Sequence, residues 1–286
     1  MAGKTVKDGR AALKHQLADR SPKGVAKMKA HLRATLAEIG RLDTASLSPA
    51  IRTHVDVVQA SYGNALQGLG FAYGDVSVGG WRNSPYVVVQ NVGAYLDIPR
   101  MLDSDHRVDT SDDAEAYLDR LESYAEQLDG ETERLKIAAA NGVIAPDFLL
   151  DKCLRQIKGA RGGNTAGWDV VTSLANRTAG MAGDYGQKAW LLANDKIAPA
   201  LDRQIAELDR HRARATSDAG VWKFRDGDAY YAWALSAGTT TTMSPDEVHK
   251  MGLDQLAAIQ SEMDAILKKE GYTQGSVGRR MEALAK

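Results

Sequence analysis

The sequence has one cysteine in 286 residues, a formal net charge of only −1 and no long apolar run. A single cysteine excludes an internal disulfide framework and a zinc site built from cysteines. The 36 lysines and arginines stand against 37 aspartates and glutamates, which argues against the broad basic surface that nucleic-acid binding needs. Since no stretch of about 18 apolar residues occurs, no membrane-spanning helix is predicted.

The length and the start of the chain bear on its class and its location. A chain of 286 residues can bury a substantial core in one or two domains. Residues 1–10 carry charges with no apolar segment behind them. We therefore expect no secretion signal; the sequence as written is that of a cytoplasmic protein, but the compartment stays unknown. The composition is typical of a soluble globular protein and indicates no particular activity.

The strongest helical pattern covers residues 112–141. Apolar side chains recur there at steps of three and four, which places them on one face of a helix. Thr110 or Ser111 can cap the start, and Gly142 suits the position after the end. A helix of this length spans roughly 45 Å and favours an elongated helical body.

A second strong pattern begins at Ser244. Ser244 and Glu247 have the spacing of a capping box, and Pro245 suits the first helical position. Apolar residues follow at helical spacing up to position 266, and Gly271 is the expected stop. Further helices are predicted over 25–40, 48–68, 147–158, 168–179, 185–214 with a kink or break at Pro199, 226–235 and 276–286.

The remaining patterns are weaker. The run 86–89 is rich in β-branched residues, but no hairpin turn or partner strand follows it, so we interpret it as helical. Glycine-rich loops are expected at 79–80 and 159–167. We therefore predict an all-α fold with long antiparallel helices, in a single domain over residues 1–286.

No complete catalytic motif is present. The six histidines include no pair four residues apart, so the His-Glu-x-x-His zinc motif is absent. Lys152 and Arg155 could lower the pKa of Cys153, but without an identifiable partner histidine an inert thiol is the favoured interpretation. The glycines of 159–167 lack the spacing of a phosphate-binding loop.

One segment is chemically richer. Asp226 and Asp228 precede Tyr230, Tyr231 and Trp233 near the start of a predicted helix. These side chains could line a pocket for a peptide or a sugar, with the two carboxylates as an acid/base pair. The alternative, which we favour, is that the acids cap the helix and the aromatic rings fill the core. The threonines at 239–242 are equally ambiguous between ligand binding and turn formation.

The same region carries a family resemblance. Its segments 226–231, 240–242 and 244–249 resemble the bacterial family called domain of unknown function 885 (DUF885), and the segments 84–88, 113–118 and 142–148 agree in the same order. The resemblance covers most of the chain. It implies a largely helical protein, similar in build to zinc peptidases whose long helices enclose a deep substrate channel.

The resemblance also implies groups that this chain does not contain. Family members are about twice as long and carry a His-Glu-x-x-Pro-Gly-His zinc motif in their second half. This chain resembles the first half, and none of its six histidines matches the motif. Zinc is thus implied for the full-length family, while no metal ligand, cofactor or catalytic residue is assigned here. Residues 1–286 would then be an incomplete N-terminal portion of a larger domain.

Two functions follow as hypotheses. In the first, the chain is the N-terminal half of a zinc-metallopeptidase-like hydrolase, supplies scaffold and channel wall for a peptide-like substrate, and is inactive alone. From their chemistry and position, the candidate substrate contacts are Tyr86, Tyr230, Tyr231 and His249. In the second, the chain is a non-catalytic helical interaction protein from a truncated or split gene. Its uncovered apolar face would then pair with a second copy or a separately encoded half.

Overall fold

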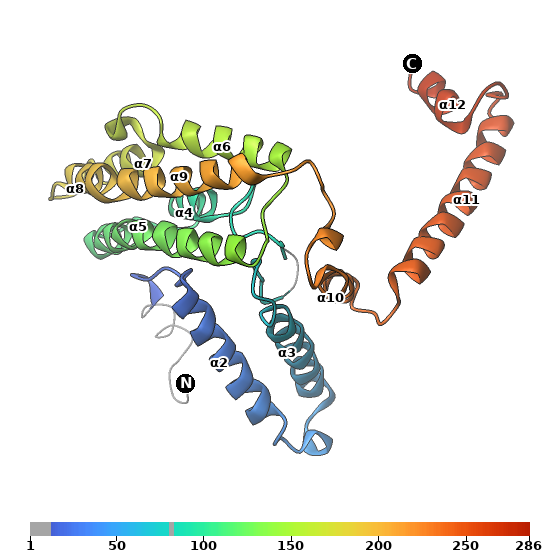
Figure 1. The fold of residues 1–286 in the computed structure, drawn as a ribbon, viewed down its shortest axis with the longest axis horizontal. Coiled ribbons are helices and arrows are strands. Elements are labelled where there is room, and N and C mark those ends of the chain that lie inside the picture. Colours follow the sequence, from blue (N-terminus) through green and yellow to red (C-terminus); the bar gives the residue numbers. More distant parts are fainter. Residues whose placement is uncertain (1–12, 80–82) are drawn as a thin grey trace. The chain divides into compact units, whose positions relative to one another are not determined.

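The structure is a computed structural model that describes residues 13–79 and 83–286 (Figure 1). Within these residues the regular elements are helices and helical turns, and β pairing is limited to isolated bridges. The predicted all-α fold is confirmed. The chain divides into two compact units, Met1–Tyr230 and Tyr231–Lys286. The assignment of one domain to the whole chain stays a prediction.

The helices agree with the sequence patterns to within a few residues, except at α4 and at 86–89. The first unit contains α2 (Pro22–Ile39), α3 (Pro49–Gly68), α4 (Ala94–Ser104), α5 (Ser111–Ala140), α6 (Asp147–Arg161), α7 (Asp169–Arg177), α8 (Tyr185–Leu192) and α9 (Ala198–Arg214). The boundary between the units falls within α10 (Gly227–Thr239), and the second unit continues with α11 (Pro245–Lys269) and α12 (Val277–Leu284).

Helix α5 forms the centre of the first unit. It packs against α4, α8 and α9, and α9 packs in turn against α6. In Figure 1, α5 and α9 run in the same direction and α6 runs back. Tyr117, Leu121 and Leu128 of α5 are fully buried, with 0% of their surface exposed. This helix therefore supplies much of the core. Helices α2 and α3 form an antiparallel hairpin, and α2 reaches α5.

Capping boxes set the starts of the two longest helices, and the sequence predicts the box at Ser244 and Glu247 and a cap at Thr110. The Thr110 side chain accepts from the Asp113 N–H, and the Asp113 carboxylate accepts from the Thr110 N–H. Ser244 and Glu247 make the same pair of bonds at the start of α11. Helix α5 ends before Gly142, whose φ of +79° is a conformation that glycine adopts without strain.

The predicted break near Pro199 is confirmed. One π-helical turn, Ala193–Ile197, separates α8 from α9, and Pro199 lies in the first turn of α9. Because proline cannot donate a backbone hydrogen bond, the hydrogen-bond ladder changes its register at this point.

Helix α4 is not predicted by any local pattern. It contains Pro99 inside its span, begins after Gly93, and has no cap from a neighbouring side chain. Proline inside a helix and a missing cap both argue against helix in a single sequence. The start of α4 is completed by α5, which lies far away in the sequence.

The prediction of a helix over 86–89 is wrong. These four residues are buried and follow a bent path. Val89 and Val92 exchange backbone hydrogen bonds of 3.1 and 3.0 Å across a tight turn in which Asn91 has a φ of +65°. A turn closed in this way cannot continue a helix.

The two expected loops have different outcomes. The loop over 159–167 is shorter than predicted, because α6 extends to Arg161 and Thr165–Gly167 forms a 3-10 turn. At 79–80, Gly79 lies in a turn with a φ of +108°. Gly80 lies outside the described residues.

Most of the apolar stripe predicted for α11 is exposed, while Val248 and Met263 are half-buried. The side chains that are 44–61% exposed on this helix are Met251, Leu253, Leu256, Ile259 and Ile266. Within the second unit α11 packs against α12, whose Arg280 forms an ion pair with Asp264. Across the described ranges, no helix combines the length and the apolarity needed to cross a bilayer.

Candidate functional site

Two of the four predicted contact residues, Tyr86 and Tyr230, lie in one buried aromatic cluster. The ring centroid of Tyr230 is 5.2 Å from that of Phe71 and 5.4 Å from that of Tyr73. Phe224 links Tyr73 to Tyr86, with centroid separations of 5.6 and 6.1 Å. These separations are in the range of favourable aromatic pairs, so the five rings form a packed group.

The tyrosine hydroxyls of this cluster are in an apolar environment. Tyr73 Oη and Tyr86 Oη are buried and have no hydrogen-bond partner among the described residues. Burial raises the pKa of each of these two hydroxyls to about 12, and burial also raises the pKa of Tyr230. Hydroxyls with such pKa values stay protonated near neutral pH, so they can donate hydrogen bonds but cannot act as bases.

The other two predicted contacts, Tyr231 and His249, belong to the second unit. Tyr231 is 51% exposed, and His249 is exposed on α11. Asp226 and Asp228 are also exposed, while Trp233 is buried. The buried rings agree with the favoured interpretation that this segment fills a core. A role in substrate contact for the four predicted residues stays a prediction.

A buried polar stripe on α5 organises the other side of the first unit. Its members, Gln127, Glu131 and Arg134, lie four and three residues apart and have at most 11% of their side-chain surface exposed. They bind segments that are distant in the sequence. Sequence motifs do not identify these residues, and the signal that could have found them is their spacing along an otherwise apolar helix face.

Glu131 ties two segments to α5. Both of its carboxylate oxygens accept from the Ala94 N–H at 2.9 Å, and Oε1 accepts from Arg20 Nη1 at 2.8 Å. Burial raises the pKa of Glu131, although Arg20 and the Ala94 N–H oppose that rise. Glu131 replaces the missing local cap of α4, where a carboxylate also meets the positive end of the helix dipole.

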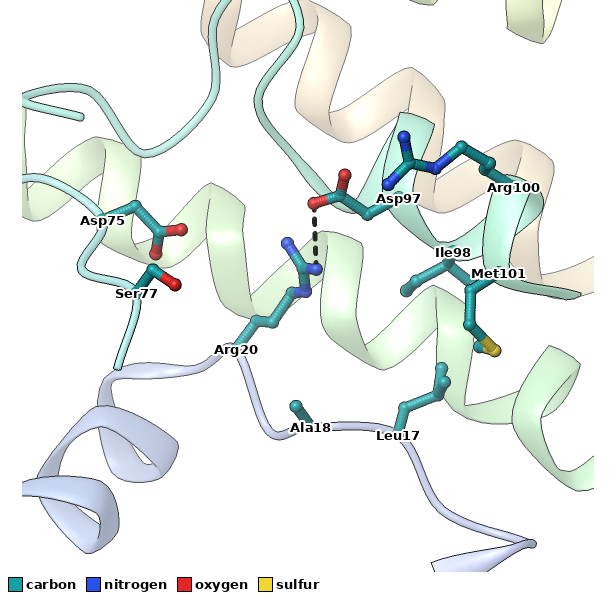
Figure 2. A pocket seen from close by; sticks show the side chains of 9 residues that line it. All are labelled: Leu17, Ala18, Arg20, Asp75, Ser77, Asp97, Ile98, Arg100 and Met101. Atoms are coloured by element: carbon teal, nitrogen blue, oxygen red, sulfur yellow. Dashed lines mark hydrogen bonds and ion pairs between the residues drawn. The ribbon is translucent and has the colours of Figure 1, made fainter. Parts of the chain in front are cut away.

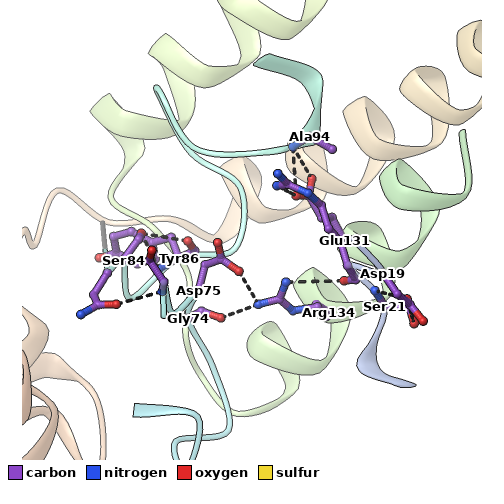
Figure 3. A network of polar contacts seen from close by, with 12 residues as sticks. Asp19, Ser21, Gly74, Asp75, Ser84, Tyr86, Ala94, Glu131 and Arg134 are labelled. Carbon is purple, nitrogen blue, oxygen red and sulfur yellow. Dashed lines mark hydrogen bonds and ion pairs between the residues drawn. The ribbon is translucent and has the colours of Figure 1, made fainter. Parts of the chain in front are cut away.

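Arg134 holds the loop at 74–75 (Figure 3). Its Nη2 donates to the Gly74 carbonyl and to Asp75 Oδ1, both at 2.8 Å. Asp75 and Ser84 exchange backbone hydrogen bonds of 2.8 and 2.9 Å, and Ser84 Oγ donates to the Tyr86 carbonyl at 2.8 Å. A chain of polar contacts therefore runs from α5 to the aromatic cluster.

A cleft of about 450 Å³ opens beside this stripe. It is bounded by the segment before α2, the loop at 75–77 and α4 (Figure 2). Figure 2 shows Asp75 and Ser77 on one side of Arg20, with Asp97 and Arg100 on the other. Apolar side chains of α4 complete the lining. The cleft is therefore a candidate binding site with charged groups of both signs.

Gly130 lets the backbone before α2 approach α5. A Cβ at this position would lie 2.9 Å from both the nitrogen and the Cα of Ser21. We expect Gly130→Ala to lower the free energy of unfolding by about 1–3 kcal/mol, although alanine favours a helix by about 1 kcal/mol over glycine. Urea denaturation measures the change.

The matched control for this substitution is Gly159→Ala in α6. A Cβ there would meet no atom within 4 Å, so the helix preference of alanine acts without a steric cost, and the variant should be neutral or more stable. A Gly130→Ala protein that is stabilised as much as Gly159→Ala would contradict the close approach at Ser21.

Comparisons with known proteins agree with this architecture. A family model described as "bacterial protein of unknown function (DUF885)" matches residues 3–286. Among curated proteins no match is found. A similar crystal structure is that of a protein described as a candidate lipoprotein from Colwellia psychrerythraea, with 23% sequence identity and a TM-score of 0.87. The match covers 99% of this chain and 50% of that chain, so the present chain spans half the length of this relative, with which it shares the fold.

Proposed function

The chain belongs to the DUF885 family of bacterial proteins, and we propose that it forms the N-terminal helical half of a zinc-metallopeptidase-like hydrolase. In this role it supplies scaffold and one wall of a channel for a peptide-like substrate. The catalytic groups belong to the remaining half, and this chain does not hydrolyse peptides alone.

The exposed stripe of α11 carries this proposal. Leu256, Ile259 and Ile266 are each more than half exposed on a helix roughly 37 Å long. Contiguous apolar surface of this kind is typical of an interaction site. The relative from Colwellia psychrerythraea has as much chain again outside the matched half, and a second half of that size is a source of the covering surface.

Zinc is not assigned to this chain. A zinc site needs three or four histidine, cysteine or carboxylate ligands close together. Among residues 13–79 and 83–286, no group of three such side chains could hold a metal ion. The described residues therefore do not fit a zinc site, and we assign them no hydrolytic step.

The same stripe also favours a second function, that of a non-catalytic helical interaction protein. In that case α11 binds a second copy of the chain or a separate protein, and no metal motif belongs to the assembly. The two functions differ in the partner that covers α11, so the identity of that partner separates them.

A binding experiment makes this distinction. The probe is the polypeptide encoded directly after Lys286 or by the adjacent gene, and the first proposal requires that it contain His-Glu-x-x-Pro-Gly-His. We expect this polypeptide to co-purify with the chain. Leu256→Glu combined with Ile259→Glu should weaken the complex at least 100-fold, because two charges would enter an apolar interface.

The control for the binding experiment is Ser261→Glu. It adds a charge on the polar side of α11, opposite Ile259 and Leu256 on the helix, and should leave the complex unchanged. Absence of the motif from both stretches of DNA would overturn the peptidase-like proposal in favour of an interaction protein. Zinc-dependent cleavage of a peptide mixture by the purified chain alone, detected by mass spectrometry, would also overturn it.

A further inference from the structure

Among the described residues that line the cleft beside α4, Arg100 is a cation that a ligand can use. Arg20 is already held by Glu131 Oε1 at 2.8 Å and by Asp97 Oδ2 at 3.1 Å. Arg100 lies one turn after Asp97 on α4 and is exposed. Within the described part of the chain, Arg100 forms no ion pair with an acidic side chain. Its guanidinium is therefore available to a carboxylate that enters the cleft.

The opposite side of the cleft carries an acid and a hydroxyl. Asp75 has 35% of its side-chain surface exposed, and Arg134 binds its Oδ1 at 2.8 Å. Figure 2 shows Asp75 and Ser77 together on this side, across from Arg100. Among the described residues the lining includes two arginines and two aspartates, and Arg20 is already paired with Asp97. Among the described lining residues, the groups left for a ligand are the Arg100 guanidinium on the α4 side and the Asp75 carboxylate, which Arg134 binds through Oδ1, on the opposite side. A pair of opposite charges suits a ligand that carries both charges better than a simple anion or cation.

We infer that this cleft binds a short zwitterionic peptide, with its carboxylate on Arg100 and its ammonium group on Asp75 and Ser77. Bonds from a guanidinium to a carboxylate are charge-assisted and among the stronger hydrogen bonds in proteins. Ile98 and Met101 line the same cleft and provide an apolar contact for a peptide side chain. The choice of a peptide rests on the proposed function, whereas the charge pattern alone requires only a zwitterion.

The size of the cleft limits the ligand to a short one. Its volume of about 450 Å³ is in the range of small-molecule sites. The dipeptide Ala-Leu has two opposite charges and one larger apolar side chain, so it provides each of the three contacts that the cleft offers. It is therefore the probe.

Isothermal titration calorimetry of the whole chain with Ala-Leu, N-acetyl-Ala-Leu and Ala-Leu-amide tests this inference. Ala-Leu should bind at least tenfold more tightly than either capped form, since each cap removes one charge-assisted contact. Arg100→Gln should weaken Ala-Leu about tenfold and leave Ala-Leu-amide unchanged, because the amide has no carboxylate to lose. Arg107→Gln is the control, because the Arg107 side chain is 85% exposed and does not line the cleft; it should bind Ala-Leu normally.

Three results would overturn the inference. The first is the absence of any heat of binding for Ala-Leu at millimolar concentration. The second is equal affinity for Ala-Leu and its amide. The third is an equal loss of affinity for both ligands in Arg100→Gln. None of these results affects the proposed function, because binding is measured on the chain alone and requires neither a second half nor hydrolysis. Conversely, a missing zinc motif beyond Lys286 would leave binding of the zwitterion intact.

Discussion

Replacing Glu131 with alanine should lower the free energy of unfolding by about 3–5 kcal/mol, the typical cost of removing one partner of a buried ion pair. Glu131 is 1% exposed. Its loss would leave the Ala94 N–H without its side-chain acceptor and the Arg20 guanidinium without its closest carboxylate. We expect α4 to fray at its start, because no neighbouring side chain caps it.

Two further variants separate the charge of Glu131 from its role as an acceptor. Glu131→Gln keeps an acceptor for Ala94 and removes the charge, so its loss of stability should be smaller than that of Glu131→Ala. Glu126→Ala, on the exposed side of α5, should change stability by less than about 0.5 kcal/mol. Urea denaturation gives the three values, and hydrogen exchange at Ala94 reports on α4. A Glu131→Ala protein with a fully protected Ala94 amide would contradict the capping role.

Helices α4 and α5 show which parts of the fold a single sequence predicts. Helix α5 has its start signal in Thr110 and Asp113 and its stop signal in Gly142, so its bounds follow from residues that it contains or adjoins. The cap of α4 comes from Glu131, 37 residues after Ala94. A cap supplied across the fold leaves no local pattern, and Pro99 argues against a helix there.

The candidate site also contains residues that the sequence indicates and residues that it does not. Tyr86 and Tyr230 stand out as aromatic residues in matching motifs, and the structure places both in one cluster through Phe224 and Tyr73. The sequence does not indicate that Arg20 meets α5, because that contact depends on how the segment before α2 packs. Long-range ion pairs are set by packing, whereas motifs report residue types at fixed spacing.

The stripe of α11 marks another limit of pattern analysis. The apolar positions after Ser244 correctly predict an amphipathic helix with a capping box. They do not indicate what the apolar face contacts, since an exposed face and a core face have the same periodicity. Leu256 and Ile259 are both more than half exposed, which the periodicity alone does not show.

Cys153 should react with thiol reagents at least 100-fold more slowly in the folded protein than in the denatured chain at pH 8. Its side chain is 0% exposed, with Tyr95 Oη 3.9 Å from its sulfur. Burial raises the pKa of the thiol to about 11. Each unit of rise removes tenfold of the reactive thiolate at pH values below the pKa, and burial adds a barrier to access.

The single cysteine makes this measurement unambiguous, because every labelled molecule is labelled at Cys153. Labelling with a chromogenic disulfide should be slow in buffer and fast in guanidinium, which is the control for reagent activity. Glu131→Ala should accelerate the labelling of Cys153. The Cys153 sulfur contacts Tyr95, and Tyr95 belongs to the first turn of α4, which Glu131 caps. Rapid labelling of the folded parent protein would contradict an inert thiol. Unchanged labelling in a destabilised Glu131→Ala protein would show that access to Cys153 does not depend on the cap of α4.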